Sequence, residues 1–127
     1  MPVIALLPLV LLLLSADATT VTAAEGPPTD RIATSAGPLD LTFLGHGTLM
    51  LTFKDTVLHV DPYGKVADYA ALPRADLVLL THDHADHLDQ AALALVRTPV
   101  TDSVLPPVCA DRVQGGLILK NGETRTV

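Results

Sequence analysis

A strand that leads directly into a cluster of histidines is the feature that most constrains how this chain can fold. The run ADLVLL, residues 75–80, is almost continuously apolar, which is typical of strands that are covered on both faces. The segment THDHADHLD, residues 81–89, follows at once and holds three of the five histidines of the chain. A tight loop after a rigid strand can hold several side chains close to one point. We therefore expect a functional site at the end of this strand.

The histidine-rich loop offers imidazole nitrogen and carboxylate oxygen, the ligands that a divalent ion such as Zn²⁺ prefers. His82 and His84 can address one ion if the loop stays extended, whereas Asp86 and His87 lie past a bend and can address a second ion. Asp83, between two candidate ligands, is expected to point away. Zn²⁺ is the expected metal, as one or two ions, with Mn²⁺ or Fe²⁺ as alternatives. The alternative explanation is a polar surface loop that happens to be rich in histidine and aspartate.

A short helix is expected after the loop. Asp89 can cap its amino terminus, and Ala92, Leu93 and Val96 fall on one helical face. Capping gives Asp89 a sufficient role without a metal.

Upstream of the buried strand, short β-prone runs predict an antiparallel meander. LTFLGHG and TLMLTF are separated by a Gly-His-Gly turn, and Lys54-Asp55 forms a two-residue link into TVLHVD. Downstream, the sequence predicts a strand over residues 100–105, a helix over 108–113 and a terminal hairpin at an Asn-Gly turn. This order of elements predicts the α/β class with a mixed sheet.

The amino terminus has the pattern of an export signal. Its apolar run, Val3 to Leu14, is too short to span a bilayer as a helix, and small residues follow it. We expect a signal peptide over residues 1–23, a linker over 24–38 that is rich in Pro, Gly, Thr and Ser, and a folded domain over 39–127. The product would be periplasmic or secreted, without membrane attachment after cleavage. An uncleaved membrane anchor is the alternative.

Charge and cysteine content exclude some classes of partner and bond. The net charge of −6 and the scattered eight Lys and Arg leave no basic surface for nucleic acid. Cys109 is the single cysteine, so no intrachain disulfide can form, and we expect its thiol to pack in the core.

The H-x-H-x-D-H pattern, set between the strand ADLVLL and Leu88-Asp89, closely resembles the metal-binding motif of the metallo-β-lactamase-fold hydrolases. LTFLGHGTLMLTF and VLHVDPY resemble the opening strands of the lactonase-like branch of that superfamily. The resemblance covers roughly residues 39–127. It implies the α/β class, with half of an αββα sandwich in which helices flank a mixed sheet.

The resemblance also implies roles for individual residues. His82 and His84 would bind one metal ion, and Asp86 and His87 the other, with Asp86 also orienting a metal-bound hydroxide as the catalytic carboxylate. Asp61 would accept a hydrogen bond from a ligand histidine, although a turn aspartate before a proline is an equal alternative.

Two histidines lie outside the motif. The glycines around His46 let the backbone approach closely, which favours a position at the pocket; a simple turn histidine is an equal alternative. His59 stands where the family usually has an aliphatic residue, and we interpret it as incidental.

The ligand set of the family is incomplete in this sequence. Family members take further ligands from a second half, whereas no histidine follows His87 here. A truncated and inactive fragment is the preferred explanation; a second chain that completes the fold and a degenerate remnant are the others. The expected function is metal-dependent hydrolysis of a small ester, lactone or amide. The alternative is a non-catalytic exported module that binds metal or a partner.

Overall fold

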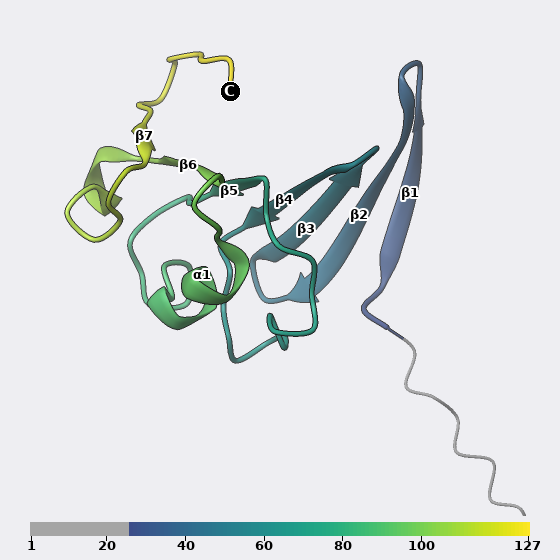
Figure 1. The fold of residues 1–127 in the computed structure, drawn as a ribbon, viewed down its shortest axis with the longest axis horizontal. Helices are drawn as coiled ribbons and strands as arrows, with labels where there is room; N and C mark the ends of the chain where they lie inside the picture. The colour runs from purple at the N-terminus through teal and green to yellow at the C-terminus, as the bar shows by residue number, and fades with distance from the viewer. Residues whose placement is uncertain (1–25) are drawn as a thin grey trace, which may run out of the picture.

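One seven-stranded sheet organises the protein, with its strands in the same order as in the chain (Figure 1). The computed structural model describes residues 26–127, so the expected signal peptide lies outside the described residues. The strands are β1 (Thr29–Thr34), β2 (Gly37–Gly45), β3 (Thr48–Phe53), β4 (Thr56–Val60), β5 (Leu77–Leu79), β6 (Asp102–Leu105) and β7 (Leu117–Ile118). The sheet is mixed, as predicted: β1 to β4 pair antiparallel and β4 to β7 pair parallel.

The antiparallel half is the predicted meander, with one more strand than expected. The tight Lys54-Asp55 link joins β3 to β4 as the sequence predicts. Residues 29–34, which we expected to belong to the linker, instead form β1 and pair with β2 through six residue pairs. Arg31 and Asp40 face each other across this pair and form two hydrogen bonds of 2.6 and 2.7 Å. The prediction of a linker that extends to residue 38 is therefore wrong.

The parallel half contains the predicted strand, loop and helix. Helix α1 spans Gln90–Val96 and connects β5 to β6. Asp89 caps it by accepting hydrogen bonds from the backbone N–H groups of Ala91 and Ala92, as predicted. Ala92, Leu93 and Val96 are buried, also as predicted.

Two predicted elements near the carboxyl terminus are wrong. The helix expected over 108–113 is only a 3-10 turn, Pro107–Cys109, followed by irregular turns. The expected terminal hairpin stops at its turn: Glu123 N–H donates to the carbonyl of Lys120, but residues 123–127 form no strand. Those residues are exposed, so little packing holds them in an extended pairing.

The core lies between one face of the sheet and the cover formed by α1 and the segment that precedes β5. Leu44, Val78 and Leu105 project from the sheet into this layer, and Tyr69 and Leu93 pack onto them. Cys109 is free and fully buried there, as predicted, and burial raises the pKa of its thiol.

The opposite face of the sheet is apolar and incompletely covered. Cross-strand partners such as Leu41 and Leu51, or Leu58 and Leu77, share this face. Each of its apolar side chains is half-buried or exposed, and Phe43 is 40% exposed. The face consists of Ile32, Leu39, Leu41, Phe43, Leu49, Leu51, Phe53, Leu58, Val60, Leu77, Leu79, Val104 and Leu117. Strand β5 is therefore buried on one face only within residues 26–127, not on both as its sequence suggests.

Within this same part of the chain, no helix has the length and apolar character that crossing a membrane requires.

Candidate metal centre

The candidate site lies where the parallel strands β4 and β5 end side by side. Asp61 directly follows β4, and the histidine-rich loop directly follows β5. The backbone N–H of Asp61 donates to the carbonyl of Leu79 at 3.0 Å, which fixes the two chain segments against each other. Ligand sites of open α/β sheets commonly lie beyond the carboxyl ends of the strands.

Asp61 is the buried centre of a hydrogen-bond network. Its carboxylate is 2% exposed and accepts a hydrogen bond of 2.8 Å from Nδ1 of His87. The same carboxylate accepts from the backbone N–H of Thr81 at 2.8 Å and from the Thr81 hydroxyl. Because the hydroxyl proton of Thr81 goes to Asp61, its oxygen accepts from Nδ1 of His82 at 2.9 Å.

This network leaves the same nitrogen free on both histidines. His87 and His82 carry their ring proton on Nδ1, the first bound to Asp61 and the second to Thr81, so the lone pair of each Nε2 is available. The two rings lie with centroids 4.0 Å apart. Histidine ligands of metals are usually held in this way by an outer hydrogen bond to a carboxylate or hydroxyl. The donor set therefore fits a divalent ion.

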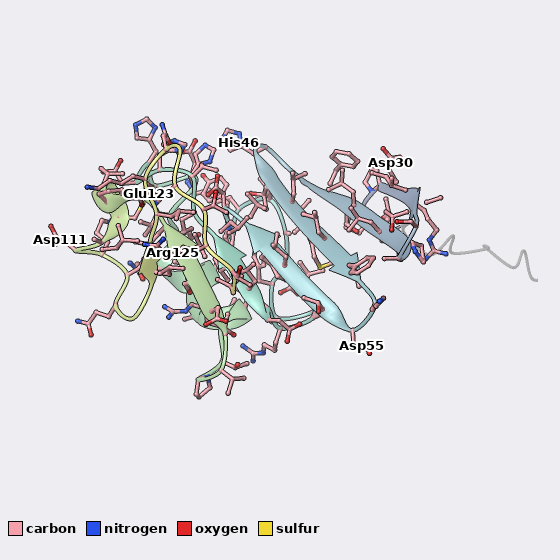
Figure 2. The ribbon with its side chains drawn as sticks, turned by 90° about the horizontal axis from the view of Figure 1, so that it is seen from above. Asp30, His46, Asp55, Asp111, Glu123 and Arg125 are labelled. Carbon is pink, nitrogen blue, oxygen red and sulfur yellow. The ribbon has the colours of Figure 1, made fainter. Side chains whose placement is uncertain are left out.

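The Gly-His-Gly turn between β2 and β3 approaches the loop from the other side. The strand register shifts near Gly45, and His46 has a positive φ of 54°. In this turn Gly47 lies against the ring of His87. A Cβ atom on Gly47 would lie 2.9 Å from Cε1 of His87, closer than real Cβ atoms approach, so any larger residue would force the His87 ring or the turn to shift. Figure 2 shows His46 at the opposite end of the strands from Asp55.

Asp86 is the exposed carboxylate of the site. Nε2 of His46 donates to its Oδ2 at 2.8 Å, and Nε2 of His87 lies 3.9 Å from the same oxygen. The pKa of Asp86 lies below its usual value because its own backbone N–H and then the His46 imidazole donate hydrogen bonds to it. Its side chain is 40% exposed, which leaves it accessible to a small molecule.

The described residues contain two groups of three candidate donors whose ligand atoms all lie within 4.8 Å of one another. The first consists of His46, Asp86 and His87, and the second of Asp61, His82 and His87. His84 belongs to neither group, although its ring lies 4.5 Å from that of His82. Five of the six predicted site residues are thus brought together.

Sequence reasoning missed Thr81, whereas its interpretation of His59 as outside the site agrees with the two donor groups, neither of which contains His59. The only signal for Thr81 is its position between strand and motif, which is common to many strand ends. His59, which we interpreted as incidental, is fully buried below Tyr69 and is hydrogen-bonded through Nε2 to the carbonyl of Pro73 at 3.0 Å. Burial lowers its pKa, so it belongs to the core as a neutral imidazole.

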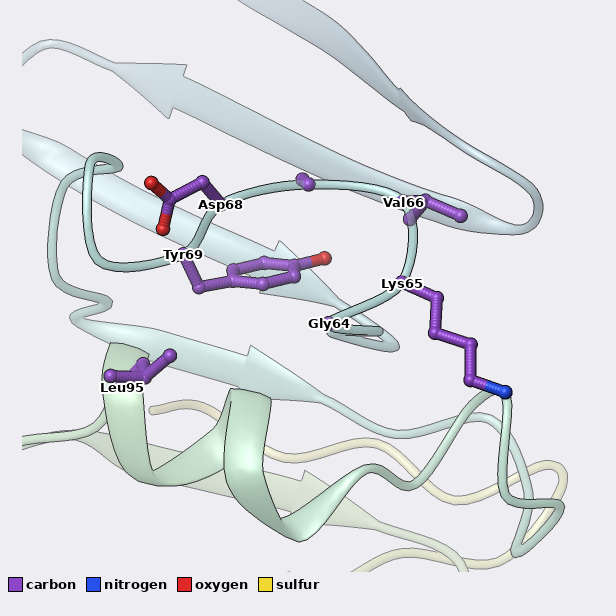
Figure 3. A pocket seen from close by; sticks show the side chains of 7 residues that line it. Gly64, Lys65, Val66, Asp68, Tyr69 and Leu95 are labelled. Atoms are coloured by element: carbon purple, nitrogen blue, oxygen red, sulfur yellow. The ribbon is translucent and has the colours of Figure 1, made fainter.

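The described residues form two shallow pockets, and one of them borders the site. One lies beside α1, and Figure 3 shows the Tyr69 ring between Leu95 on one side and Lys65 on the other. None of the candidate donors lines this pocket. The other, about 480 Å³, lies at the ends of β5 and β6 and is lined by Thr81 and by residues 119–123 among others. The second pocket therefore adjoins the hydrogen-bond network.

Comparison with known proteins identifies the family. A profile of the beta-lactamase superfamily domain matches residues 40–122. The chain belongs to the beta-lactamase superfamily. This match includes the Gly-His-Gly turn, the histidine-rich loop and α1.

The superfamily relatives include proteins named as metal-dependent hydrolases. One, from Haloarcula marismortui, is 38% identical over 68 residues, or 48% of this chain and 28% of that protein. Another, from Nitratidesulfovibrio vulgaris, is 38% identical over 56 residues, or 40% of this chain and 23% of that protein. A crystal structure from Parabacteroides distasonis, assigned as a metal-dependent hydrolase, has a TM-score of 0.76 and 38% identity over 79% of this chain and 46% of that chain. The match spans less than half of each protein.

Proposed function

We propose that this chain carries the metal-binding part of a metal-dependent hydrolase, and that the metal is Zn²⁺. The observation that carries the proposal is the shared anchoring of His82 and His87 by Asp61, directly or through Thr81, with both Nε2 atoms free. Imidazole and carboxylate together suit Zn²⁺, with Mn²⁺ or Fe²⁺ as alternatives. His82, His84, Asp86 and His87 are the proposed ligands.

A divalent ion in this position would act as a Lewis acid and would lower the pKa of bound water. The residues of the chain have separate tasks around it. Asp61 and Thr81 orient the ligand imidazoles, and the exposed Asp86 carboxylate can accept a proton or position the attacking water.

The proposed substrate is a small ester, lactone or amide. The pocket of about 480 Å³ next to Thr81 has the volume of a small-molecule site and lies at the carboxyl ends of the parallel strands. The acidic net charge of −6 does not favour nucleic acid as a substrate. We further propose that the protein itself is exported to the periplasm or secreted.

We infer that a complete enzyme needs a second half over the uncovered sheet face. In support, the match spans less than half of each relative, and the face from Leu41 to Leu79 is apolar and open. The second half would come from further sequence or from another chain. The rival function is a non-catalytic module that binds metal. The partial match to the relatives and the open sheet face favour this rival if the chain acts without a second half.

Metal binding by the purified full chain tests the proposal. Zn²⁺ should bind in stoichiometric amount and raise the midpoint temperature of thermal unfolding. The unfolding free energy should rise by about 2.7 kcal/mol when free Zn²⁺ is at 100 times its dissociation constant. His87→Ala, which removes a donor from both groups of three, should abolish that shift, and His82→Ala should reduce it. Asp55→Asn, in the remote β3–β4 turn, should retain it. Binding that is equal in all four proteins would refute the metal site. Binding without turnover of ester, lactone, amide or β-lactam substrates would favour the rival.

A further inference from the structure

The turn residue His46 has a left-handed backbone conformation in the link between β2 and β3. Its φ of 54° is in the left-handed region, which side chains other than glycine seldom adopt. The side chain is 46% exposed, so burial does not explain its placement. Its one side-chain hydrogen bond among the described residues reaches 40 positions along the chain to Asp86. Non-glycine residues in such conformations are enriched at functional sites, and the contact with Asp86 distinguishes His46 from Lys54, which has the same conformation.

The donor atoms around Asp86 are spaced for a common ion. Oδ2 of Asp86 lies 2.8 Å from Nε2 of His46 and 3.9 Å from Nε2 of His87. Two ligands at about 2.05 Å from a tetrahedral Zn²⁺ lie about 3.3 Å apart, which falls between these two distances. The His46 and His87 rings are 5.3 Å apart and inclined by 51°, so that neither blocks the other.

Each of the three donors is independently fixed. His87 is tied through Nδ1 to Asp61, and the close approach of Gly47 holds its ring from the opposite side. Asp86 lies in the loop turn, where the N–H of His87 donates to the carbonyl of His84 at 3.0 Å. His46 is fixed by the short link between β2 and β3.

We propose that His46, Asp86 and His87 form a three-donor site for one divalent cation of the Zn²⁺ class, in which His46 is a direct ligand. The inference rests on the proposed function, because it takes Asp86 and His87 as ligands. It adds a nitrogen donor from outside the histidine-rich motif, supplied by the β2–β3 turn. Nε2 of His46 donates its proton to Asp86 in the metal-free chain, and it would bind the ion in the tautomer that carries the proton on Nδ1. With two nitrogens and one oxygen the site suits Zn²⁺, and the exposure of His46 and Asp86 leaves a further coordination position open to solvent.

Zn²⁺ titration of the metal-depleted full chain, labelled with ¹⁵N, tests this assignment. The imidazole ¹⁵N signals report which ring nitrogens bind the ion, independently of any enzymatic activity. The Nε2 signals of His46 and His87 should both shift on addition of Zn²⁺. His46→Gln, which retains an N–H donor near the position of Nε2 but no ligand nitrogen, should lower the Zn²⁺ affinity at least about tenfold, the smallest loss expected even for an outer partner of a ligand.

The matched control is Lys54→Gln, because Lys54 has nearly the same φ of 53° in the turn at the other end of β3. It should bind Zn²⁺ as the unchanged chain does. Zn²⁺ binding that shifts His87 but not His46, or that is unaffected by His46→Gln, would overturn this inference and leave the proposed function standing. A chain that binds no Zn²⁺ at all would refute both. Circular dichroism of each variant establishes that it has folded.

Discussion

Nδ1 of the His87 imidazole lies 2.8 Å from Oδ2 of Asp61, and the Asp61 carboxylate is almost completely buried. The same carboxylate binds the backbone and hydroxyl of Thr81 and, through that hydroxyl, orients His82. The buried Asp61 carboxylate thus orients the imidazoles of His82 and His87, which lie in the loop after the neighbouring strand β5. The site therefore depends on a residue that is not itself required to bind metal.

Replacing Asp61 with Asn tests this dependence. Asn keeps the left-handed backbone tolerable at φ 45°, but an amide nitrogen cannot accept the hydrogen bonds that Thr81 and His87 donate. We expect Zn²⁺ affinity to fall about 10- to 100-fold and the unfolding free energy of the metal-free chain to fall by about 1–3 kcal/mol. Isothermal titration and urea unfolding measure these two effects. Asp55→Asn is the control, and equal affinities in the two variants would contradict the role of Asp61.

Gly47→Ala should disturb the same imidazole from the opposite side. The new Cβ would lie 2.9 Å from Cε1 of His87, so the ring or the turn must move. We expect a loss of about 1–3 kcal/mol in unfolding free energy and weaker Zn²⁺ binding. Gly26→Ala is the control, because its Cβ would meet nothing within 4 Å. Unchanged binding in Gly47→Ala would show that the contact with His87 is not restrictive.

The buried His59 should make stability depend on pH. Burial lowers its pKa below 6.5, against the opposing effect of its hydrogen bond to Pro73. As pH falls below about 6.5, the His59 imidazole therefore binds a proton more readily in the unfolded chain than in the folded chain. Its contribution to stability is complete above about pH 6.5 and is lost as pH falls toward the lower pKa of the folded state, at no more than about 1.4 kcal/mol per pH unit.

His59→Leu isolates that contribution. The variant lacks the one buried histidine but keeps the other four. Its unfolding free energy should therefore fall less steeply than that of the unchanged chain between about pH 7 and 5. Chemical unfolding at a series of pH values measures both slopes. Parallel slopes would mean that His59 is protonated equally in the folded and unfolded chains.

The two faces of the sheet should respond differently to charge. Leu51→Lys places an ammonium group on the open face and should cost about 1 kcal/mol or less, with less self-association in sedimentation experiments. Val78→Lys, on the covered face, would bury an unpaired charge and should prevent folding. If both variants unfolded alike, the face that includes Leu51 would have to be covered in solution.

Local sequence patterns predicted the elements whose causes are local. The cap at Asp89 and the apolar face of α1 could be predicted because their partners lie within one or two helical turns. The link at Lys54-Asp55 follows in the same way from its immediate neighbours. Strand β1 could not be predicted, since all six of its residues are exposed and the sequence therefore shows no alternation of buried and exposed positions. The Asn-Gly turn formed as predicted, but a turn alone does not hold the strand expected after it.

The candidate site was predicted where its residues are contiguous. His82, Asp86 and His87 come from one loop, so their proximity follows from the sequence. Thr81 and Asp61 meet only because β4 and β5 pair in parallel, 20 residues apart in the chain. Contacts of this kind depend on strand pairing, which no short motif encodes.

The matching order of strands in the sheet and in the chain has a consequence for biosynthesis. Each strand pairs only with strands adjacent to it in the chain, so each can add to the sheet as it leaves the ribosome. The apolar face of the partly formed sheet is then open to solvent during synthesis. We expect such a nascent polypeptide to bind a chaperone until that face is covered.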